Sequence, residues 1–472
     1  MPRAIGRLLN LLLVAYLALA AGLLYWQVVA AGELTGDPRL NGYRIDAMAR
    51  QDVRGQILDR NGERLAYSEL TADGRVRRYP YPPAAHVTGY WSRRYGTSGL
   101  EGVLDRALRG EQGGGAAAVR DRLLHRPVVG LDVVTTIDLR LQRAADEALG
   151  DRTGAAIAID PRTGEVLALA SHPFADPNRI DQEGQQLSRG APGDPLVNRA
   201  TSGLYAPGST FKLVTYTAAL SNGVVTPETV FEDPDNGIVV ERTLIPDPNH
   251  PGRPRFNARE ALALSSNAAF AEIGVKVTGA RLRDQARLFG FGAPVPFDLP
   301  TVTSEVARDP NFLRSDLGAA TTAIGQGQLL VTPIQMGQVA AAIANGGQSL
   351  KPRLVSEVRS DQGRVVARSS PEQLQRVSSP EVARQVTEGM LLAVQISPAQ
   401  TAALPNVAVA GKSGTAEFGQ TGVTHAWFVA FAPAEAPRIA VAVIEERAGG
   451  GSTFAGPVAR RMLEVGLQVT KP

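Results

Sequence analysis

An apolar segment near the N-terminus constrains this chain more than any other feature. From Leu8 to Ala31 the chain runs for 24 residues with only Asn10 and Gln27 as strongly polar interruptions. A helix of about 20 apolar residues is long enough to cross the hydrocarbon core of a bilayer. The segment therefore predicts one transmembrane helix, with everything that follows it on one side of a membrane.

The charges that flank this segment predict its orientation. Arg3 and Arg7 precede it, whereas Glu33 and Asp37 follow it. Because basic flanks stay in the cytoplasm, residues 1–7 are expected to be a cytoplasmic tail and the rest of the chain to lie outside. Ala18-Leu19-Ala20 resembles a signal-peptide cleavage site, so a cleaved signal peptide is the alternative. The apolar run continues well beyond that site, which favours a permanent anchor at residues 8–31.

Composition sets broad limits on the 472-residue chain. Hydrophobic residues make up 44% and charged residues 20%, as in ordinary globular proteins, and the length allows two or three domains. A net charge of only +3 gives no sign of a nucleic-acid surface. The absence of cysteine excludes disulfides and thiolate sites. The five histidines include no pair at metal-ligand spacing, so we expect neither a metal nor another cofactor.

Residues 32–150 are predicted to form a small, extended N-terminal platform. This region is rich in arginine, glycine and proline and too poor in apolar residues for a large core. Gly55–Asp59 reads as a strand, residues 59–62 as a turn and Gly113–Gly115 as a flexible loop. A strand at Leu131–Ile137 and a helix at Leu139–Leu149 would end the platform.

A denser domain is predicted over residues 151–472. Two strands around a turn begin it, helical patterns dominate from about residue 204 to 347, and strands return near the C-terminus. The predicted strands are 155–160, 165–171, 407–410, 426–432 and 439–445, and the predicted helices are 213–220, 258–277, 333–344 and 457–467. Strands at both ends with helices between them indicate an α/β fold built on one mostly antiparallel sheet flanked by helices.

A serine and a lysine three residues apart form the first chemical motif. Ser209 and Lys212 follow a Pro-Gly turn at the start of a predicted helix, where positions i and i+3 share one face. Only five of the 49 basic residues are lysine, which makes each one notable. Lysine becomes a base when burial and nearby cations lower its pKa. A capping serine beside a surface lysine is the simpler interpretation of this motif alone.

Two further short motifs lie downstream. Ser265 and Asn267 precede a helical run, where they could relay a proton and hold a carbonyl group, or simply cap the helix. Lys412-Ser413-Gly414-Thr415 is predicted at the end of an edge strand, where lysine and hydroxyl groups could bind a carboxylate. A phosphate-binding loop is excluded there because Asn406 occupies the position of its first glycine.

Taken together, the three motifs occur in the order and on the elements found in penicillin-binding proteins and class A β-lactamases. The chain resembles the class B penicillin-binding proteins, which are membrane-anchored peptidoglycan D,D-transpeptidases, and in particular their compact penicillin-binding protein A type. The resemblance runs from about Arg50 to the C-terminus. It is carried by RGQILDRNGERLA, GLEGVLDRALRG, AIDPRTGEVLALASHPFADPN, NRATSGLYAPGSTFK, AIGQGQLLVTPIQM and HAWFVAFAP. Ser413 stands where this family usually has threonine.

The resemblance implies a penicillin-binding, serine β-lactamase-like fold and a set of roles. Ser209 would be the nucleophile and Lys212 its base, with some exchange of roles between Lys212 and Lys412 left open. Ser265 would pass a proton and Asn267 would orient the substrate. Lys412, Ser413 and Thr415 would bind the terminal carboxylate, and Gly414 would be a further substrate-binding residue. Substrates would be peptidoglycan stem peptides, with β-lactams as covalent inhibitors and no nucleic acid as a partner.

Other functions remain open at this stage. A D,D-carboxypeptidase or a β-lactamase would share the motifs but let water resolve the acyl-enzyme. A β-lactam sensor usually has more membrane spans than the single one predicted here. A scaffold that recruits a glycosyltransferase of the SEDS family, through the anchor and platform, could coexist with catalysis in cell-wall synthesis. Division and elongation roles are not distinguished.

Overall fold

A computed structural model describes residues 2–30, 53–72, 74–111, 129–233, 237–248, 254–309, 311–417 and 422–470. The predicted loop at Gly113–Gly115 lies outside these ranges. Helix α1 (Pro2–Leu24) and a following π-helical turn, η1 (Tyr25–Val29), contain an apolar stretch over Ile5–Gln27 with none of its span buried. Within the described chain it is the one helix whose length and composition suit a membrane span, in line with the predicted anchor.

The region after the anchor is built on a six-stranded sheet. Its strand order is β15-β14-β6-β1-β2-β3. The strands are β1 (Ile57–Leu58), β2 (Arg64–Thr71), β3 (Gly74–Arg78), β6 (Asp132–Thr135), β14 (Val355–Arg359) and β15 (Val365–Arg368). The hairpin β14–β15 comes from far downstream and pairs antiparallel with β6. The sequence did not predict this hairpin, and a division of the chain at residue 150 stays a prediction.

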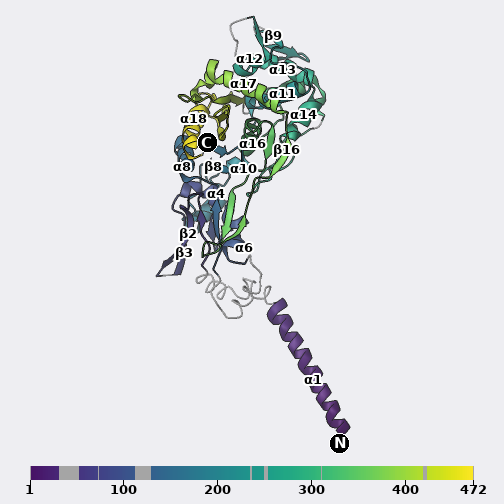
Figure 1. Ribbon diagram of the computed structural model, residues 1–472, viewed down its shortest axis with the longest axis vertical. Coiled ribbons are helices and arrows are strands. Elements are labelled where there is room, and N and C mark those ends of the chain that lie inside the picture. The colour runs from purple at the N-terminus through teal and green to yellow at the C-terminus, as the bar shows by residue number, and fades with distance from the viewer. Residues whose placement is uncertain are drawn as a thin grey trace.

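Short elements complete this region and lie between α1 and the larger helical part of the molecule (Figure 1). They are η2 (Pro82–Ala84), α4 (Ala85–Thr88), β4 (Trp91–Ser92), β5 (Gly96–Thr97), α5 (Gly99–Val103) and α6 (Asp105–Leu108). The turn predicted at residues 59–62 is present, because the Asp59 carboxylate accepts hydrogen bonds from the backbone N–H groups of Asn61 and Glu63.

The second region is organised around a five-stranded sheet in which each neighbouring pair is antiparallel. Its order is β17-β18-β19-β7-β8. The strands are β7 (Gly154–Ile159), β8 (Val166–His172), β17 (Ala410–Glu417), β18 (Thr424–Ala432) and β19 (Ile439–Glu445). In β18, Trp427, Val429 and Phe431 join one buried cluster, whereas Phe428 and Ala430 join the other. This alternation places a core on each face of the sheet, so the antiparallel α/β prediction is confirmed.

Helices cover both faces. Helices α8 and α18 pack on one side of the sheet, and α16 packs against β19 and β7 on the other. The helices and 3₁₀ turns of this region are α8 (Leu139–Leu149), α9 (Ile180–Ser188), α10 (Arg199–Ser202), η3 (Gly208–Phe211), α11 (Lys212–Ser221), α12 (Ala258–Leu264), α13 (Asn267–Val277), α14 (Gly279–Leu288), η4 (Phe312–Arg314), α15 (Asp316–Ala323), α16 (Pro333–Ala344), α17 (Pro380–Ile396), η5 (Pro398–Ala402) and α18 (Ala455–Val469).

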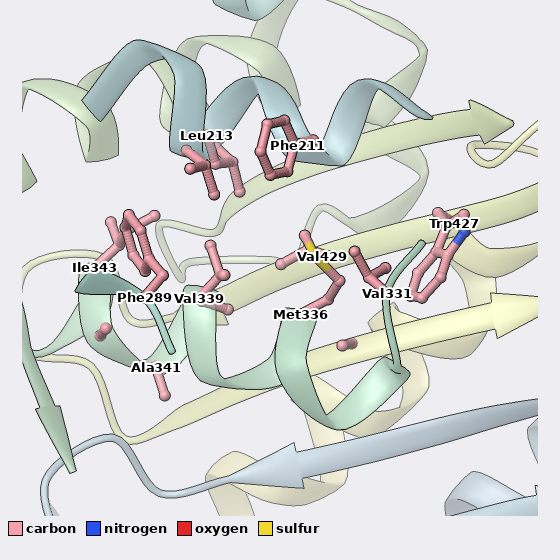
Figure 2. Packing of buried hydrophobic residues seen from close by; sticks show 14 of the residues in the cluster. Phe211, Leu213, Phe289, Val331, Met336, Val339, Ala341, Ile343, Trp427 and Val429 are labelled. Carbon is pink, nitrogen blue, oxygen red and sulfur yellow. The ribbon is translucent and has the colours of Figure 1, made fainter. Parts of the chain in front are cut away.

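The buried helix α16 connects the sheet to the segment that carries the first motif. Figure 2 shows Phe211 and Leu213 pointing toward Met336 and Val339 of α16. Phe211, Leu213, Met336 and Val339 are each fully buried in the same cluster. Burying a large apolar side chain is worth about 1.5–3 kcal/mol, so this packing fixes the η3–α11 segment firmly over the sheet.

The structure corrects three expectations. The helix predicted over 258–277 is broken into α12 and α13 at Ser265 and Ser266. The strand predicted at 407–410 instead begins at Ala410 and runs on through the lysine motif to Glu417, because it pairs with β18 along its whole length. The helical region also contains small strand pairs that were not predicted, namely β9 (Val230–Glu232) with β12 (Arg255–Asn257), β10 (Ile238–Val240) with β11 (Thr243–Ile245), and β13 (Gln348–Leu350) with β16 (Gln373–Arg376).

Candidate active site

Ser209 and Lys212 lie in a 3₁₀ turn and at the start of the α-helix that follows it. Ser209 is half-buried in the 3₁₀ turn η3, and Lys212 is the first residue of α11. Side chains at i and i+3 eclipse one another in a 3₁₀ turn, so the two side chains leave the backbone on the same side. The serine faces a cavity, whereas the lysine side chain is completely buried.

The Lys212 amine is held by the second motif. Its Nζ atom donates to the backbone carbonyl of Ser265 at 2.7 Å and to Oδ1 of Asn267 at 2.8 Å, and Ser265 Oγ lies 3.3 Å away. The ring of Phe270 lies beneath the nitrogen at 5.4 Å. In the described part of the chain no hydrogen bond joins Lys212 Nζ to Ser209. The structure thus brings the first two predicted motifs into direct contact through the lysine.

Burial makes both motif lysines unusually easy to deprotonate. Burial, together with the positive charge of Lys412, holds the pKa of Lys212 well below its usual range, while Asp247 opposes the shift. Burial alone lowers the pKa of Lys412 to about 7. A lysine that is neutral near physiological pH can accept a proton, as a general base must.

The break between α12 and α13 gives the second motif its shape. Ser265 ends α12 with a φ of +65°, in the left-handed region that a residue other than glycine seldom adopts. Ser266, rather than Ser265, is the N-cap of α13, accepting a hydrogen bond from the backbone N–H of Ala269. This turn directs the Ser265 carbonyl and the Asn267 side chain to the same lysine amine.

The third motif lies within β17, the edge strand of the five-stranded sheet. Lys412, Gly414 and Ala416 are buried, whereas Ser413 and Thr415 are more exposed, as strand alternation requires. Lys412 is 1% exposed, and its Nζ donates to the carbonyl of Ser413 at 3.1 Å. Ser413 and Thr415 are therefore the members of this motif that present hydroxyl groups to the cavity.

Glycines allow η3 and β17 to approach each other closely. A Cβ atom on Gly414 would lie 2.9 Å from the Pro207 carbonyl oxygen and 2.9 Å from Cγ2 of Thr210. A Cβ atom on Gly208, whose φ is +53°, would lie 2.6 Å from the Thr415 carbonyl oxygen. Only glycine fits at such positions, so both glycines are needed to place Ser209 beside the strand.

The three motifs meet in one cavity of about 530 Å³. Among its lining residues are Ser209, Ser265, Asn267, Ser413, Gly414 and Thr415, whereas Lys212 and Lys412 are buried behind the wall. Every predicted site residue therefore lies at the cavity or directly behind it. Among the residues that the structure describes, no group of three or more His, Asp or Glu side chains is placed to hold a metal ion.

Sequence reasoning missed two parts of this site. Gly450–Thr453, after β19, forms one wall of the cavity, and Gly451 lies so close that a Cβ atom would be 2.2 Å from the Gly414 carbonyl oxygen. Asp247 lies between Pro246 and Pro248, which line the cavity, and is itself 3% exposed. Two sequence signals were available for these parts of the site: the run of three glycines at 449–451 and an aspartate between two prolines.

Comparison with protein families agrees with this geometry. The family described as the penicillin-binding protein transpeptidase domain matches residues 154–464, which is more than half of the chain. The chain belongs to the penicillin-binding protein family. A second family, described as the penicillin-binding protein A dimerisation domain, matches residues 54–125. The resemblance inferred from the motifs, including the compact penicillin-binding protein A type, is confirmed.

Individual relatives of this penicillin-binding protein cover nearly the whole chain. The peptidoglycan D,D-transpeptidase PbpA of Mycolicibacterium smegmatis is 35% identical over 99% of both chains. The ceftriaxone acyl-enzyme complex of penicillin-binding protein A from M. tuberculosis has a TM-score of 0.80 and 34% identity, covering 89% of this chain and 99% of that one. A D,D-transpeptidase domain from Eggerthella lenta also has a TM-score of 0.80, at 32% identity.

Proposed function

We propose that this chain is a membrane-anchored peptidoglycan D,D-transpeptidase that forms its acyl-enzyme on Ser209. The observation that carries the proposal is the cavity where the nucleophile, the serine–asparagine turn and the edge strand meet, with Lys212 buried behind them. Relatives named as D,D-transpeptidases and β-lactam acyl-enzyme structures of M. tuberculosis penicillin-binding protein A support the same activity.

Acylation begins with Ser209 Oγ attacking the carbonyl carbon of the penultimate D-alanine of a stem peptide. The neutral amine of Lys212 takes the hydroxyl proton. Its two short hydrogen bonds, to the Ser265 carbonyl and Asn267 Oδ1, use both N–H groups of a neutral amine and leave its lone pair free as the acceptor. The pKa of Lys212, lowered by burial, makes the neutral form available.

The tetrahedral intermediate then collapses and the bond to the terminal D-alanine breaks. Ser265 Oγ, 3.3 Å from Lys212 Nζ, relays the proton to the departing amine, while Asn267 orients the peptide. The backbone N–H groups of Ser209 and Thr415 act as the oxyanion hole, and one such donor is typically worth about 3–4 kcal/mol. An amine of a second stem peptide next attacks the ester and releases Ser209, which completes the cross-link.

The edge strand β17 binds the donor peptide. Among the described strands β17 pairs only with β18, so its outer edge is available to an extended peptide. Ser413 and Thr415 hydrogen-bond the terminal carboxylate, and Lys412 attracts it from beneath the strand. This arrangement explains why the third motif lies in the middle of a strand rather than at its end.

We propose that this activity lies outside the cell. The arginines at positions 3 and 7 would keep the N-terminus in the cytoplasm, and the span at the N-terminus would then leave the platform and transpeptidase domain on the outer side. We place the anchor at residues 8–31, the platform at 32–150 and the transpeptidase domain at 151–472. A SEDS-family glycosyltransferase would dock on the anchor and platform and supply the glycan strands that are cross-linked.

The experiment that tests transpeptidation uses the full chain in detergent and a synthetic stem pentapeptide ending in D-Ala–D-Ala. Reactions with and without an excess of a D-amino acid acceptor are analysed by mass spectrometry. The proposal expects a product in which the acceptor replaces the terminal D-alanine. Release of D-alanine by water alone, with no exchange product at any acceptor concentration, would identify a D,D-carboxypeptidase instead.

A further inference from the structure

Asp247 is a buried carboxylate next to the proposed active site, and no step described so far uses it. It follows β11 and is flanked by Pro246 and Pro248, both of which line the cavity. Only 3% of the residue is exposed. A buried carboxylate is stable only when hydrogen bonds or charges compensate it, so its partners indicate what it does.

Its partners are the residues that follow Ser265. Asp247 Oδ2 accepts hydrogen bonds from Ser266 Oγ at 2.6 Å and from the backbone N–H of Ala268 at 3.0 Å. The adjacent Pro246 carbonyl accepts from Nδ2 of Asn267 at 3.0 Å. Pro246 and Asp247 thus contact three consecutive residues, Ser266, Asn267 and Ala268, at the end of the turn and the start of α13. The carboxylate also lies at the N-terminal end of α13, where the helix dipole favours negative charge.

These contacts support an unfavourable backbone conformation in the turn. Ser265 has a φ of +65°, in the left-handed region that is unfavourable for a residue other than glycine. The two hydrogen bonds from Ser266 and Ala268 to Asp247 fix the chain immediately after this strained residue. In consequence the Ser265 carbonyl and Asn267 Oδ1 stay in place as acceptors for the Lys212 amine.

Asp247 also acts on Lys212 through its charge. Among the residues that the structure describes, it is the carboxylate that raises the pKa of this lysine, against burial and against the positive charge of Lys412. The other described groups that contact or act on Lys212 are neutral acceptors, the aromatic ring of Phe270 and Lys412. Asp247 therefore limits how far the lysine is deprotonated at a given pH.

We propose that Asp247 is a positioning residue for the acylation reaction, which holds the Ser265–Asn267 turn by hydrogen bonds and supplies a negative charge next to it. This inference rests on the proposed function of Ser209 and Lys212. It assigns two separable tasks to one side chain: hydrogen bonding, which an asparagine oxygen can retain, and charge, which it cannot.

The test compares Asp247→Asn and Asp247→Ala with the unchanged full chain. The second-order rate constant for acylation by penicillin is measured from pH 5 to 10, together with the melting temperature. For Asp247→Asn the acidic limb of the profile is expected to move to lower pH by at least about half a unit, because a nearby opposite charge has been removed. For Asp247→Ala the acidic limb is expected to move similarly. The plateau rate should also fall about tenfold or more, because the turn loses the hydrogen bonds to Asp247 that hold it.

Asp298→Asn is the matched control. Asp298 Oδ2 also accepts two backbone hydrogen bonds, from Leu354 and Val355, but this carboxylate is not among the described charges that shift the pKa of Lys212. The variant Asp298→Asn should change the melting temperature without moving the acidic limb of the pH profile. If Asp247→Asn behaves like Asp298→Asn, Asp247 is merely structural and the inference is overturned.

A second measurement keeps this inference separate from the proposed function. The chain has only five lysines, so Lys212 can be followed in a spectrum of protein labelled with ¹³C at lysine Cε. Its titration midpoint should fall in Asp247→Asn and stay unchanged in Asp298→Asn. An unshifted midpoint overturns the inference even if penicillin acylates the protein. A failure of the unchanged chain to react with penicillin contradicts the proposed function instead.

Discussion

The side-chain nitrogen of Lys212 lies 2.7 Å from the backbone carbonyl oxygen of Ser265. This contact joins the helix that follows the proposed nucleophile to a left-handed turn 53 residues further along the chain. It also explains why a lysine is needed at position 212 in a chain that otherwise uses arginine for most of its basic residues. An arginine at this position could not act as a neutral base, because its guanidinium group does not give up its proton.

Replacing Lys212 with arginine should therefore abolish the base while keeping a positive charge. We expect the rate of penicillin acylation to fall by about 10²–10⁴-fold, the usual contribution of a general base. Lys276→Arg is the control, since Lys276 is half-exposed and pairs with Glu272 on the surface of α13. The stopped-flow acylation rate checks both variants, and a Lys212→Arg enzyme with a rate close to that of Lys276→Arg would refute the assigned role.

We expect the buried Lys412 side chain to lower the free energy of unfolding of the protein. Burial lowers its pKa to about 7, whereas an unfolded lysine titrates near 10.5. Between these values the unfolded state binds more protons, so stability rises with pH as the penalty disappears. Lys412→Met should therefore be more stable than the unchanged protein at pH 6–7, by more than about 1 kcal/mol, with the difference vanishing toward pH 10.5.

Chemical unfolding at several pH values measures this effect. Lys351→Met serves as the control, because Lys351 is exposed and forms a surface ion pair with Glu372. The control should show no pH-dependent gain in stability. Loss of stability in Lys412→Met at neutral pH would show that hydrogen bonding of the ammonium group outweighs its burial.

His172 should stabilise the protein in acid. Its Nε2 lies 2.9 Å from Asp146 and its Nδ1 lies 2.8 Å from the Gly150 carbonyl, and only the imidazolium can donate to both acceptors. Burial alone would lower the pKa of His172, but the hydrogen bond to Asp146 raises this pKa above 6.5. The stabilisation is complete below about pH 6.5 and is lost as the pH rises through the folded-state pKa.

The variant His172→Asn should consequently lose about 1 kcal/mol of stability near pH 5.5 and much less near pH 8.5. The stability contributed by His86 should depend on pH in the opposite direction, because burial lowers the pKa of His86 to about 4. It contributes stability above pH 6.5 that is lost as the pH falls toward 4. Thermal denaturation from pH 4 to 9 compares His172→Asn with His86→Asn, and parallel pH curves for both would be inconsistent with these assignments.

Gly414→Ala should separate η3 from β17 and so misplace Ser209. The added methyl group would lie 2.9 Å from the Pro207 carbonyl oxygen, which cannot move without shifting η3. A displacement of about 1 Å at a reacting group can lower a rate about 10²-fold, and we expect acylation to fall by this amount. Normal acylation kinetics in Gly414→Ala would mean that the two elements can separate without harm.

The regular elements were predictable because their patterns are local. Helix Leu139–Leu149 and helix Pro333–Ala344 were predicted with the bounds observed, and so was strand Ile439–Glu445. Amphipathic or continuous apolar runs with a capping residue at one end suffice for such elements. The three chemical motifs were also visible, since their residue types and order depend on the reaction rather than on the packing.

Other features depend on contacts between distant segments and could not be read from the sequence. The break at Ser265 requires a left-handed serine, which is stabilised in part by Asp247 through Ser266 and Ala268. Strand β17 contains lysine, serine and glycine, which have little preference for strands, and its conformation follows from pairing with β18. The hairpin β14–β15 joins β6 from more than 200 residues away.

The proposed mechanism depends on a covalent bond between penicillin and Ser209, which can be measured directly. Full-length protein is incubated with a fluorescent penicillin, separated on a denaturing gel, and its labelled peptide is identified by mass spectrometry. A persistent label is expected on the peptide containing Ser209, and none on Ser209→Ala. A label that survives in Ser209→Ala, or no label on the unchanged protein, would contradict the proposed mechanism, and rapid loss of the label by hydrolysis would indicate a β-lactamase.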